Sequence, residues 1–222
     1  MLSLANPNGT GSSGNEEART LLKDGVSRET FQRLEIFVDL LTDWNDHLNL
    51  ISASTLCAVW QRHVIDSAQL IKIQPAQPGL WLDIGTGGGF PGLVVAILGE
   101  EFAPDTEYIL LEATRRKAEF LRRVVTATGI RARVLPQRAE TVAPIGAHCV
   151  SARAVAPLDL LLGLAAPHLN PDGVALLMKG RSADREIRQA RESWQFLMQS
   201  HPSRTGSGVI LALSEITGAS HV

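Results

Sequence analysis

Apolar residues in the first third of the chain recur every three or four positions, which is the spacing of one face of an α-helix. Ser27 is a favourable N-cap residue, and Glu29 follows in the first turn, where the helix dipole stabilises an anion. We therefore expect one helix to begin after Ser27 and a second to follow Ser54. Their inward faces are predicted to carry Phe31, Leu34, Val38, Leu41 and Leu48 in the first helix, and Leu56, Trp60, Val64 and Ile71 in the second.

From Leu80 onward, short apolar runs alternate with helical segments. The predicted strands are Leu80–Ile84, Tyr108–Ala113, Ala132–Leu135, His148–Ala154 and Gly173–Met178, and a last apolar stretch spans Val209–Leu213. The predicted helices follow the glycines at 85–89 and then cover Arg115–Thr126, Leu158–Ala166 and Ala183–Leu197. This alternation predicts an α/β fold with a doubly wound, mostly parallel sheet and right-handed crossovers. Ligands bind such sheets at the carboxyl ends of the strands.

The same patterns divide the chain into three parts. Residues 1–18 are rich in Gly, Ser and Asn and offer little to bury, so we expect a disordered tail there. Residues 19–78 are expected to form an N-terminal helical cap, and residues 79–222 the α/β domain.

Composition narrows the class of protein. Hydrophobic residues make up 45% of the chain and the net charge is −2, as in a globular protein with a full core. No apolar run approaches about 18 residues and no signal peptide is evident, so we expect a cytoplasmic protein without a membrane span. Cys57 and Cys149 match no metal-ligand spacing, which predicts buried free thiols and no metal site.

The stretch Leu80–Gly92 (LWLDIGTGGGFPG) carries the most specific local signal. Its glycines permit positive φ angles and let a ligand approach the backbone without meeting a Cβ atom. The dinucleotide pattern G-x-G-x-x-G fails because residue 90 is Phe90. The spacing from Asp83 to Gly89 is D-x-G-x-G-x-G, which resembles the first motif of class I S-adenosylmethionine-dependent methyltransferases. A strand–helix turn with only a structural role is the alternative.

Positive charge gathers in one segment. Between Arg115 and Arg138 there are eight basic residues and one acid, Glu119. The helical spacing turns Ala118, Leu121, Val124 and Val125 inward and leaves Arg115, Arg116, Arg122 and Arg123 outward. Such a basic face favours phosphate contact, although a solvated helix face is the ordinary explanation of a charge run.

The residues that follow the predicted strands, at the carboxyl ends of the sheet, suit a bound S-adenosylmethionine. Glu112, at the end of the second strand, can accept both ribose hydroxyls, but a dinucleotide would also use such an acid. The Ala139 backbone and Glu140 are candidates for the adenine edge, and Phe90 for apolar packing beside the ligand. Glu140 and Arg153 are equally compatible with an ion pair at the rim.

The residues after the fourth strand restrict the reaction. Enzymes that methylate exocyclic amines carry an Asn/Asp-Pro-Pro-aromatic motif there, whereas this chain has Ser151-Ala152-Arg153-Ala154. Cys149 lies inside the predicted strand and does not suit a covalent nucleophile. With these two kinds of methyl acceptor disfavoured, we expect an acceptor atom that needs neither covalent activation by the enzyme nor a catalytic base.

Taken together, the motifs resemble the bacterial small-subunit ribosomal RNA guanine-N7 methyltransferase family, GidB or RsmG. The likeness runs from about Phe31 to Ala190. It includes Arg62-His63 with Asp66-Ser67, the Asp83–Gly92 motif, Arg138-Ala139-Glu140, Ser151 with Arg153-Ala154, and Lys179-Gly180. Glu112 departs from the pattern, since aspartate is common there.

The resemblance implies S-adenosylmethionine as cofactor and a guanine of 16S rRNA as substrate. We expect this rRNA to be bound within a small-subunit particle, and no obligate protein partner is evident from the sequence. It implies that Gly85, Phe90, Ala139, Glu140 and Arg153 contact the cofactor, beside Gly87 and Glu112 from the motif chemistry. It also implies that His63 and Asp66 face the site, whereas taken alone they suggest only a local hydrogen bond. Guanine N7 carries a lone pair and no proton, so no catalytic base is expected. A nicotinamide dehydrogenase and a non-catalytic ribosome-assembly factor are the competing hypotheses.

Overall fold

The computed structural model describes residues 11–75, 79–204, 206 and 208–218. Its centre is a seven-stranded sheet in the order β3-β2-β1-β4-β5-β7-β6. The strands are β1 (Leu80–Ile84), β2 (Glu107–Leu111), β3 (Ala132–Leu135), β4 (Ala147–Arg153), β5 (Leu169–Lys179), β6 (Trp194–Pro202) and β7 (Val209–Gly218). Strands β1 to β5 pair in parallel, whereas β7 pairs antiparallel with both β5 and β6. The predicted mostly parallel, doubly wound sheet is confirmed.

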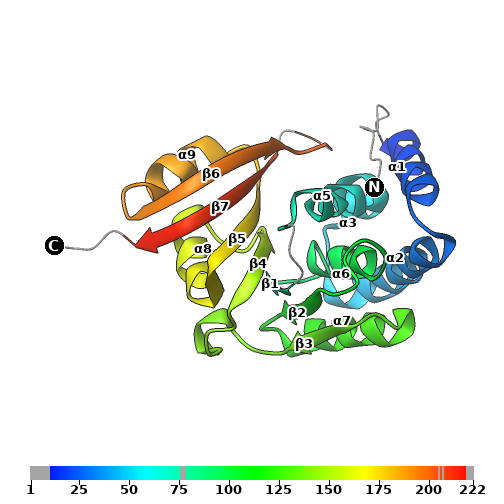
Figure 1. Ribbon diagram of the computed structural model, residues 1–222. Helices are drawn as coiled ribbons and strands as arrows, with labels where there is room; N and C mark the ends of the chain where they lie inside the picture. Colours follow the sequence, from blue (N-terminus) through cyan, green and yellow to red (C-terminus); the bar gives the residue numbers. More distant parts are fainter. Residues whose placement is uncertain (1–10, 76–78, 205, 207, 219–222) are drawn as a thin grey trace.

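Helices cover both faces of this sheet. One face carries α6 (Gly92–Phe102), α7 (Arg115–Thr128) and the N-terminal helices, and the other carries α8 (Leu158–Ala165) and α9 (Ala183–Ala190) (Figure 1). Side chains of β1 alternate between the two resulting cores, with Trp81 in the first and Leu82 in the second. Helix α6 is buried all along Gly92–Gly99 because it lies between the sheet and the cap, which explains its continuous apolar sequence.

The cap consists of α1 (Gly11–Gly25), α2 (Arg28–Leu48) and an interrupted helical stretch. Ser27 caps α2 as predicted, since its side chain accepts a hydrogen bond from Thr30 N at 3.1 Å. The predicted second helix is instead divided into α3 (Ala53–Leu56), a π-helical turn η1 (Trp60–Val64), α4 (Ile65–Ala68) and α5 (Leu70–Ile73). Helix α2 packs on α6 and α7, so cap and sheet share one hydrophobic core.

The predicted disordered tail at 1–18 is wrong for residues 11–18, which lie in α1. Ala18 and Leu22 on this helix are fully buried in the core shared with the cap. A few apolar side chains therefore order a Gly- and Ser-rich segment because tertiary packing supplies the free energy that helix propensity lacks. Residues 1–10 of that prediction lie outside the described residues, and the boundaries at 19–78 and 79–222 remain a prediction.

The predicted helix Ala183–Leu197 is too long. Helix α9 ends at Ala190, and Trp194 begins the edge strand β6, where Phe196 is buried and Gln195 and Leu197 are exposed. This local alternation is the period of a strand with one covered face. Strands β5 and β7 are also longer than predicted.

The two cysteines differ in their surroundings. Both are free, and Cys149 is buried as expected, but Cys57 is exposed. Among the described helices, none is long and apolar enough to cross a membrane.

Candidate functional site

The carboxylate of Asp83, at the carboxyl end of β1, joins three elements of the rim. Ser151 Oγ on β4 donates to Oδ1 at 2.5 Å, and Gly92 N at the start of α6 donates to Oδ2 at 3.1 Å. Trp81 Nε1 donates in turn to Ser151 Oγ at 2.9 Å. Burial raises the pKa of Asp83 to about 7, although these hydrogen bonds oppose the shift. This network fixes the position of the end of β1 relative to the start of α6. It therefore also fixes both ends of the glycine turn that connects them.

The glycine turn leaves the strand in a left-handed conformation. Gly85, Gly87 and Gly89 have φ angles of 66°, 56° and 98°. The amides of Gly85 and Thr86 donate to Leu111 O at 2.8 and 3.1 Å, which joins the turn to the end of β2. Among the described residues, a Cβ atom at Gly87 would meet only Gly85 O, at 3.7 Å, so a side chain there would occupy open space. Both backbone conformation and open space favour glycine at this position.

Glu112, directly after β2, faces the turn. Its Oε2 accepts a hydrogen bond from Gly87 N at 2.9 Å, and its Oε1 accepts one from Thr114 N at 2.7 Å. The side chain is buried. Each carboxylate oxygen has a further lone pair, so Glu112 is held in place and retains acceptor capacity for hydroxyl groups.

These elements surround a cavity of about 410 Å³, which we call the glycine-turn cavity. Its volume lies within the range of about 300–1,000 Å³ that is usual for small-ligand sites. Six of the predicted site residues line it: Gly85, Gly87, Phe90, Glu112, Arg153 and His63. Thr55 from the cap and Lys117 from α7 also line it. Thr55 is not among the predicted site residues, because nothing in the local sequence pattern around it indicates a position at the cavity.

His63 connects the cap to the glycine turn. Its ring stacks on Phe90 with centroids 4.9 Å apart, and its Nε2 lies 3.0 Å from Thr55 Oγ1. Because the Thr55 hydroxyl donates its proton to Ser52 O at 2.9 Å, we assign Nε2 as the donor to Thr55. Burial, reinforced by the charges of Arg153 and Arg62, lowers the pKa of His63 to about 3. The imidazole is therefore neutral at physiological pH.

Asp66 lies behind the glycine-turn cavity, beside Arg153. Its Oδ2 is 3.7 Å from Arg153 Nη1, and its Oδ1 accepts hydrogen bonds from Gln69 Nε2 at 2.9 Å and Ser203 Oγ at 2.6 Å. Asp66 thus joins α4 to β4 and to the β6–β7 loop. No hydrogen bond between His63 and Asp66 is present among the described residues, and Arg153 pairs with Asp66 rather than with Glu140.

The remaining two predicted cofactor residues do not line the glycine-turn cavity. Ala139 and Glu140 form the short helix η2 (Ala139–Thr141) after β3. Ala139 is buried and its carbonyl lies 3.1 Å from His168 Nε2, whereas Glu140 is exposed. Their contact with the adenine edge remains a prediction.

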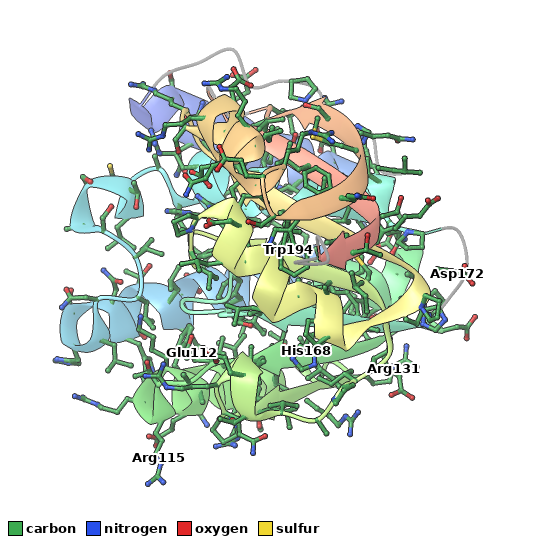
Figure 2. The ribbon with its side chains drawn as sticks, turned by 90° about the vertical axis from the view of Figure 1, so that its left-hand side faces the viewer. Glu112, Arg115, Arg131, His168, Asp172 and Trp194 are labelled. Carbon is green, nitrogen blue, oxygen red and sulfur yellow. The ribbon has the colours of Figure 1, made fainter. Side chains whose placement is uncertain are left out.

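The predicted basic segment does not form one surface. Arg115, Arg116, Arg122 and Arg123 are exposed on α7, the helix whose Lys117 lines the glycine-turn cavity. Figure 2 shows Glu112 within the molecule and Arg115 pointing outward. Arg131 precedes β3 and so lies at the amino end of that strand, where it pairs with Glu100 at 3.3 Å. Lys117 is the residue of this segment that lines the cavity, and we call the four exposed arginines of the same helix the α7 basic face.

The sequence matches a known family along most of its length. A family model described as rRNA small subunit methyltransferase G (GidB) matches residues 30–208. The chain is 49% identical over 193 residues to a ribosomal RNA small subunit methyltransferase G from Rhodospirillum centenum, covering 86% of this chain and 87% of that protein. It is 46% identical over 192 residues to the protein of that name from Cereibacter sphaeroides, covering 86% and 93%.

Solved structures establish the fold. A mitomycin 7-O-methyltransferase superposes with a TM-score of 0.58 at 16% identity, covering 95% of this chain and 74% of that one. A ribosomal protein L11 methylase from Lactobacillus delbrueckii subsp. bulgaricus superposes with a TM-score of 0.53 at 18% identity, covering 67% and 76%. The fold is therefore that of class I S-adenosylmethionine-dependent methyltransferases, as predicted.

His63 should make the protein sensitive to acid. Because its folded-state pKa is about 3 and the unfolded value about 6.5, the unfolded chain takes up the proton first as the pH falls. Stability is complete above about pH 6.5 and is lost progressively toward pH 3, with up to about 2 kcal/mol lost by pH 5. His63→Gln should reduce the difference in unfolding free energy between pH 7 and pH 5, measured in urea, by up to about that amount. His47→Gln, at an exposed position on α2, is the matched control. An equal pH dependence in wild type and His63→Gln would contradict the burial of a neutral imidazole.

Proposed function

Because the chain belongs to the rRNA small subunit methyltransferase G (GidB) family, we propose that it transfers a methyl group from S-adenosylmethionine to N7 of one guanine in 16S ribosomal RNA. The single structural observation that carries the proposal is the glycine-turn cavity. It combines a left-handed glycine turn, a buried carboxylate after β2 and the side chain of Arg153. The α7 basic face lies on the helix whose Lys117 lines this cavity. A ribosomal RNA substrate implies action in the bacterial cytoplasm.

The cavity residues fit S-adenosylmethionine. Glu112 would accept the ribose hydroxyls, since both its oxygens are oriented by backbone amides and have lone pairs to spare. Gly85 and Gly87 would permit close approach of the ligand to the backbone. Phe90, buried and stacked on His63, would supply apolar surface. Ala139 and Glu140 would flank the adenine.

The proposed chemistry needs no proton transfer from the substrate. When bound, S-adenosylmethionine supplies a methyl group on a sulfonium sulfur, and its transfer to guanine N7 leaves neutral S-adenosylhomocysteine and a cationic 7-methylguanine. The protein then contributes positioning and a polar environment that tolerates the purine becoming cationic. The neutral His63 is a positioning residue, because its ring is fixed between Phe90 and Thr55.

Gly87→Ala should weaken S-adenosylmethionine binding at least tenfold in calorimetric titration, because the added methyl group would project into the space beside the cavity wall. Gly129→Ala is the matched control, since Gly129 has a similar φ of 65° and no atom within 4 Å of an added Cβ. Both variants carry a backbone penalty of about 1–2 kcal/mol. Equal affinities in the two variants would remove Gly87 from the cofactor site.

The α7 basic face should govern affinity for RNA. Each lost phosphate contact with single-stranded RNA lowers the slope of log K against log salt by about 0.7. Replacing Arg115, Arg116, Arg122 and Arg123 by Ala should therefore flatten the slope by up to roughly 3, with S-adenosylmethionine affinity retained. Arg185→Ala with Arg188→Ala, at exposed positions on α9, should leave the slope unchanged. Equal slopes for the two sets of variants would leave the α7 arginines as a solvated helix face.

The function itself is tested by methylation of 16S rRNA with labelled S-adenosylmethionine and mapping of the product by chemical cleavage at 7-methylguanine. A single methylated guanine is expected.

The single-turnover rate at saturating cofactor and RNA should be nearly flat from about pH 6 to 9, because no obligatory base titrates there. His63→Gln should lower it by a constant factor. Absence of methylation would favour a non-catalytic assembly factor, and a rate rising tenfold per pH unit below about pH 7 would favour a proton-bearing target atom.

A further inference from the structure

A second, larger cavity adjoins the glycine-turn cavity. It has a volume of about 540 Å³ and lies where β4 and β5 end, between the cap and the β6–β7 loop. Arg153, Ala154 and Val155 line both cavities. A group seated in this second cavity would therefore lie next to a cofactor in the first.

Three segments distant in sequence fix the wall of the second cavity. Asp66 comes from the cap, Arg153 from β4 and Ser203 from the β6–β7 loop, and Asp66 binds the other two. A further hydrogen bond runs from Arg204 N to Gln69 Oε1 at 3.0 Å. A network of charged and polar contacts thus holds this wall in place.

Arg153 retains an unused donor at this wall. Its Nη1 is buried beside Asp66 Oδ2 at 3.7 Å and has no hydrogen-bond partner among the described residues. Its Nη2 donates one N–H to Arg62 O at 3.2 Å, at a partly exposed position, and has a second N–H for an acceptor supplied by a ligand. Lys179, by contrast, donates to Glu186 Oε2 at 2.8 Å and to Ala156 O at 2.7 Å, and so stabilises the wall of the cavity.

The backbone between the cavities is strained. Ala154 has a φ of 54°, a left-handed conformation that costs a non-glycine residue about 1–2 kcal/mol. Strain of this kind persists where the surrounding structure imposes it, most often at ligand sites. Here it lies on the strip of chain that both cavities share.

We propose that the second cavity receives the target guanine nucleotide, extruded from the RNA, and that the Arg153 guanidinium donates a hydrogen bond to guanine O6. The proposal rests on the function inferred above. Enzymes that modify a base remove it from the stack into a pocket. N7 and O6 are the acceptors on one edge of guanine. N7 must keep its lone pair for the methyl group, which leaves O6 for the arginine.

The charges around the second cavity suit a nucleotide whose base becomes cationic. Asp66 beside Arg153 offsets the guanidinium charge, which would otherwise repel the methylated purine. The exposed Arg62 and Arg181 line the same cavity and provide positive charge for the phosphate of the nucleotide.

To test the proposal, larger side chains are introduced at Gly180, which lines the second cavity and whose added Cβ would meet no atom of the described residues within 4 Å. In the series Gly180→Ala, Gly180→Leu and Gly180→Trp, the rate of 16S rRNA methylation should fall stepwise, by more than a hundredfold at Trp. The dissociation constants of S-adenosylmethionine and of rRNA at low salt should stay within threefold of wild type, because neither the first cavity nor the α7 basic face changes. A Gly180→Trp variant that methylates within threefold of wild type would overturn the proposal. If the large side chains unfold the protein, Arg62→Glu at an exposed position takes their place, with the same expected loss and the same overturning result.

The role of Arg153 is tested by Arg153→Lys, which keeps the charge and loses the planar fork of donors. At saturating S-adenosylmethionine, the single-turnover rate should fall at least tenfold with rRNA affinity retained, and an unchanged rate would overturn the O6 assignment. Inactivity of the wild type toward rRNA would instead refute the proposed function, so the two failures are distinguishable.

Discussion

The site depends on one buried carboxylate. Asp83 accepts from Ser151 on β4 and from the first amide of α6, so it holds two parallel strands and a helix start in fixed relation. Leaving either donor unsatisfied in this interior would cost about 1–3 kcal/mol. Complete burial of the carboxylate carries its own penalty, which appears as a pKa raised to about 7. This penalty falls at the carboxyl end of β1, where the hydrogen bonds of Asp83 fix the path by which the glycine turn leaves the sheet.

The cap completes the site rather than merely covering the sheet. A Cβ at Gly88 would lie 2.9 Å from Leu50 O, so the backbones of cap and turn approach as closely as glycine permits. His63 reaches across this contact to stack on Phe90, and Asp66 reaches Arg153. Since both residues lie on the interrupted helical stretch after α3, the π-helical turn at Trp60–Val64 belongs to the part of the cap that faces the cavities.

Charged groups with similar sequence contexts have different roles in three dimensions. Arg115 on α7 points into solvent (Figure 2), whereas Arg131 in the same basic segment pairs with Glu100 from α6. Lys179 contacts Ala156 O and Glu186 within a wall, but Arg153 Nη1 is buried without a hydrogen-bond partner among the described residues. Counting charges along the chain cannot separate these cases, because each counter-charge comes from a distant segment.

The sequence by itself determined the elements whose information is local. The glycine spacing at 85–89 predicted the turn, the Ser27 cap and the bounds of β3 were predicted correctly, and the alternation of apolar runs predicted the parallel sheet. Tertiary structure alone decided the order in α1, the edge strand β6, the exposure of Cys57 and the meeting of Asp66, Arg153 and Ser203. Periodicity and capping depend on neighbours within a few residues, whereas burial and ion pairing depend on which distant segments the fold brings together.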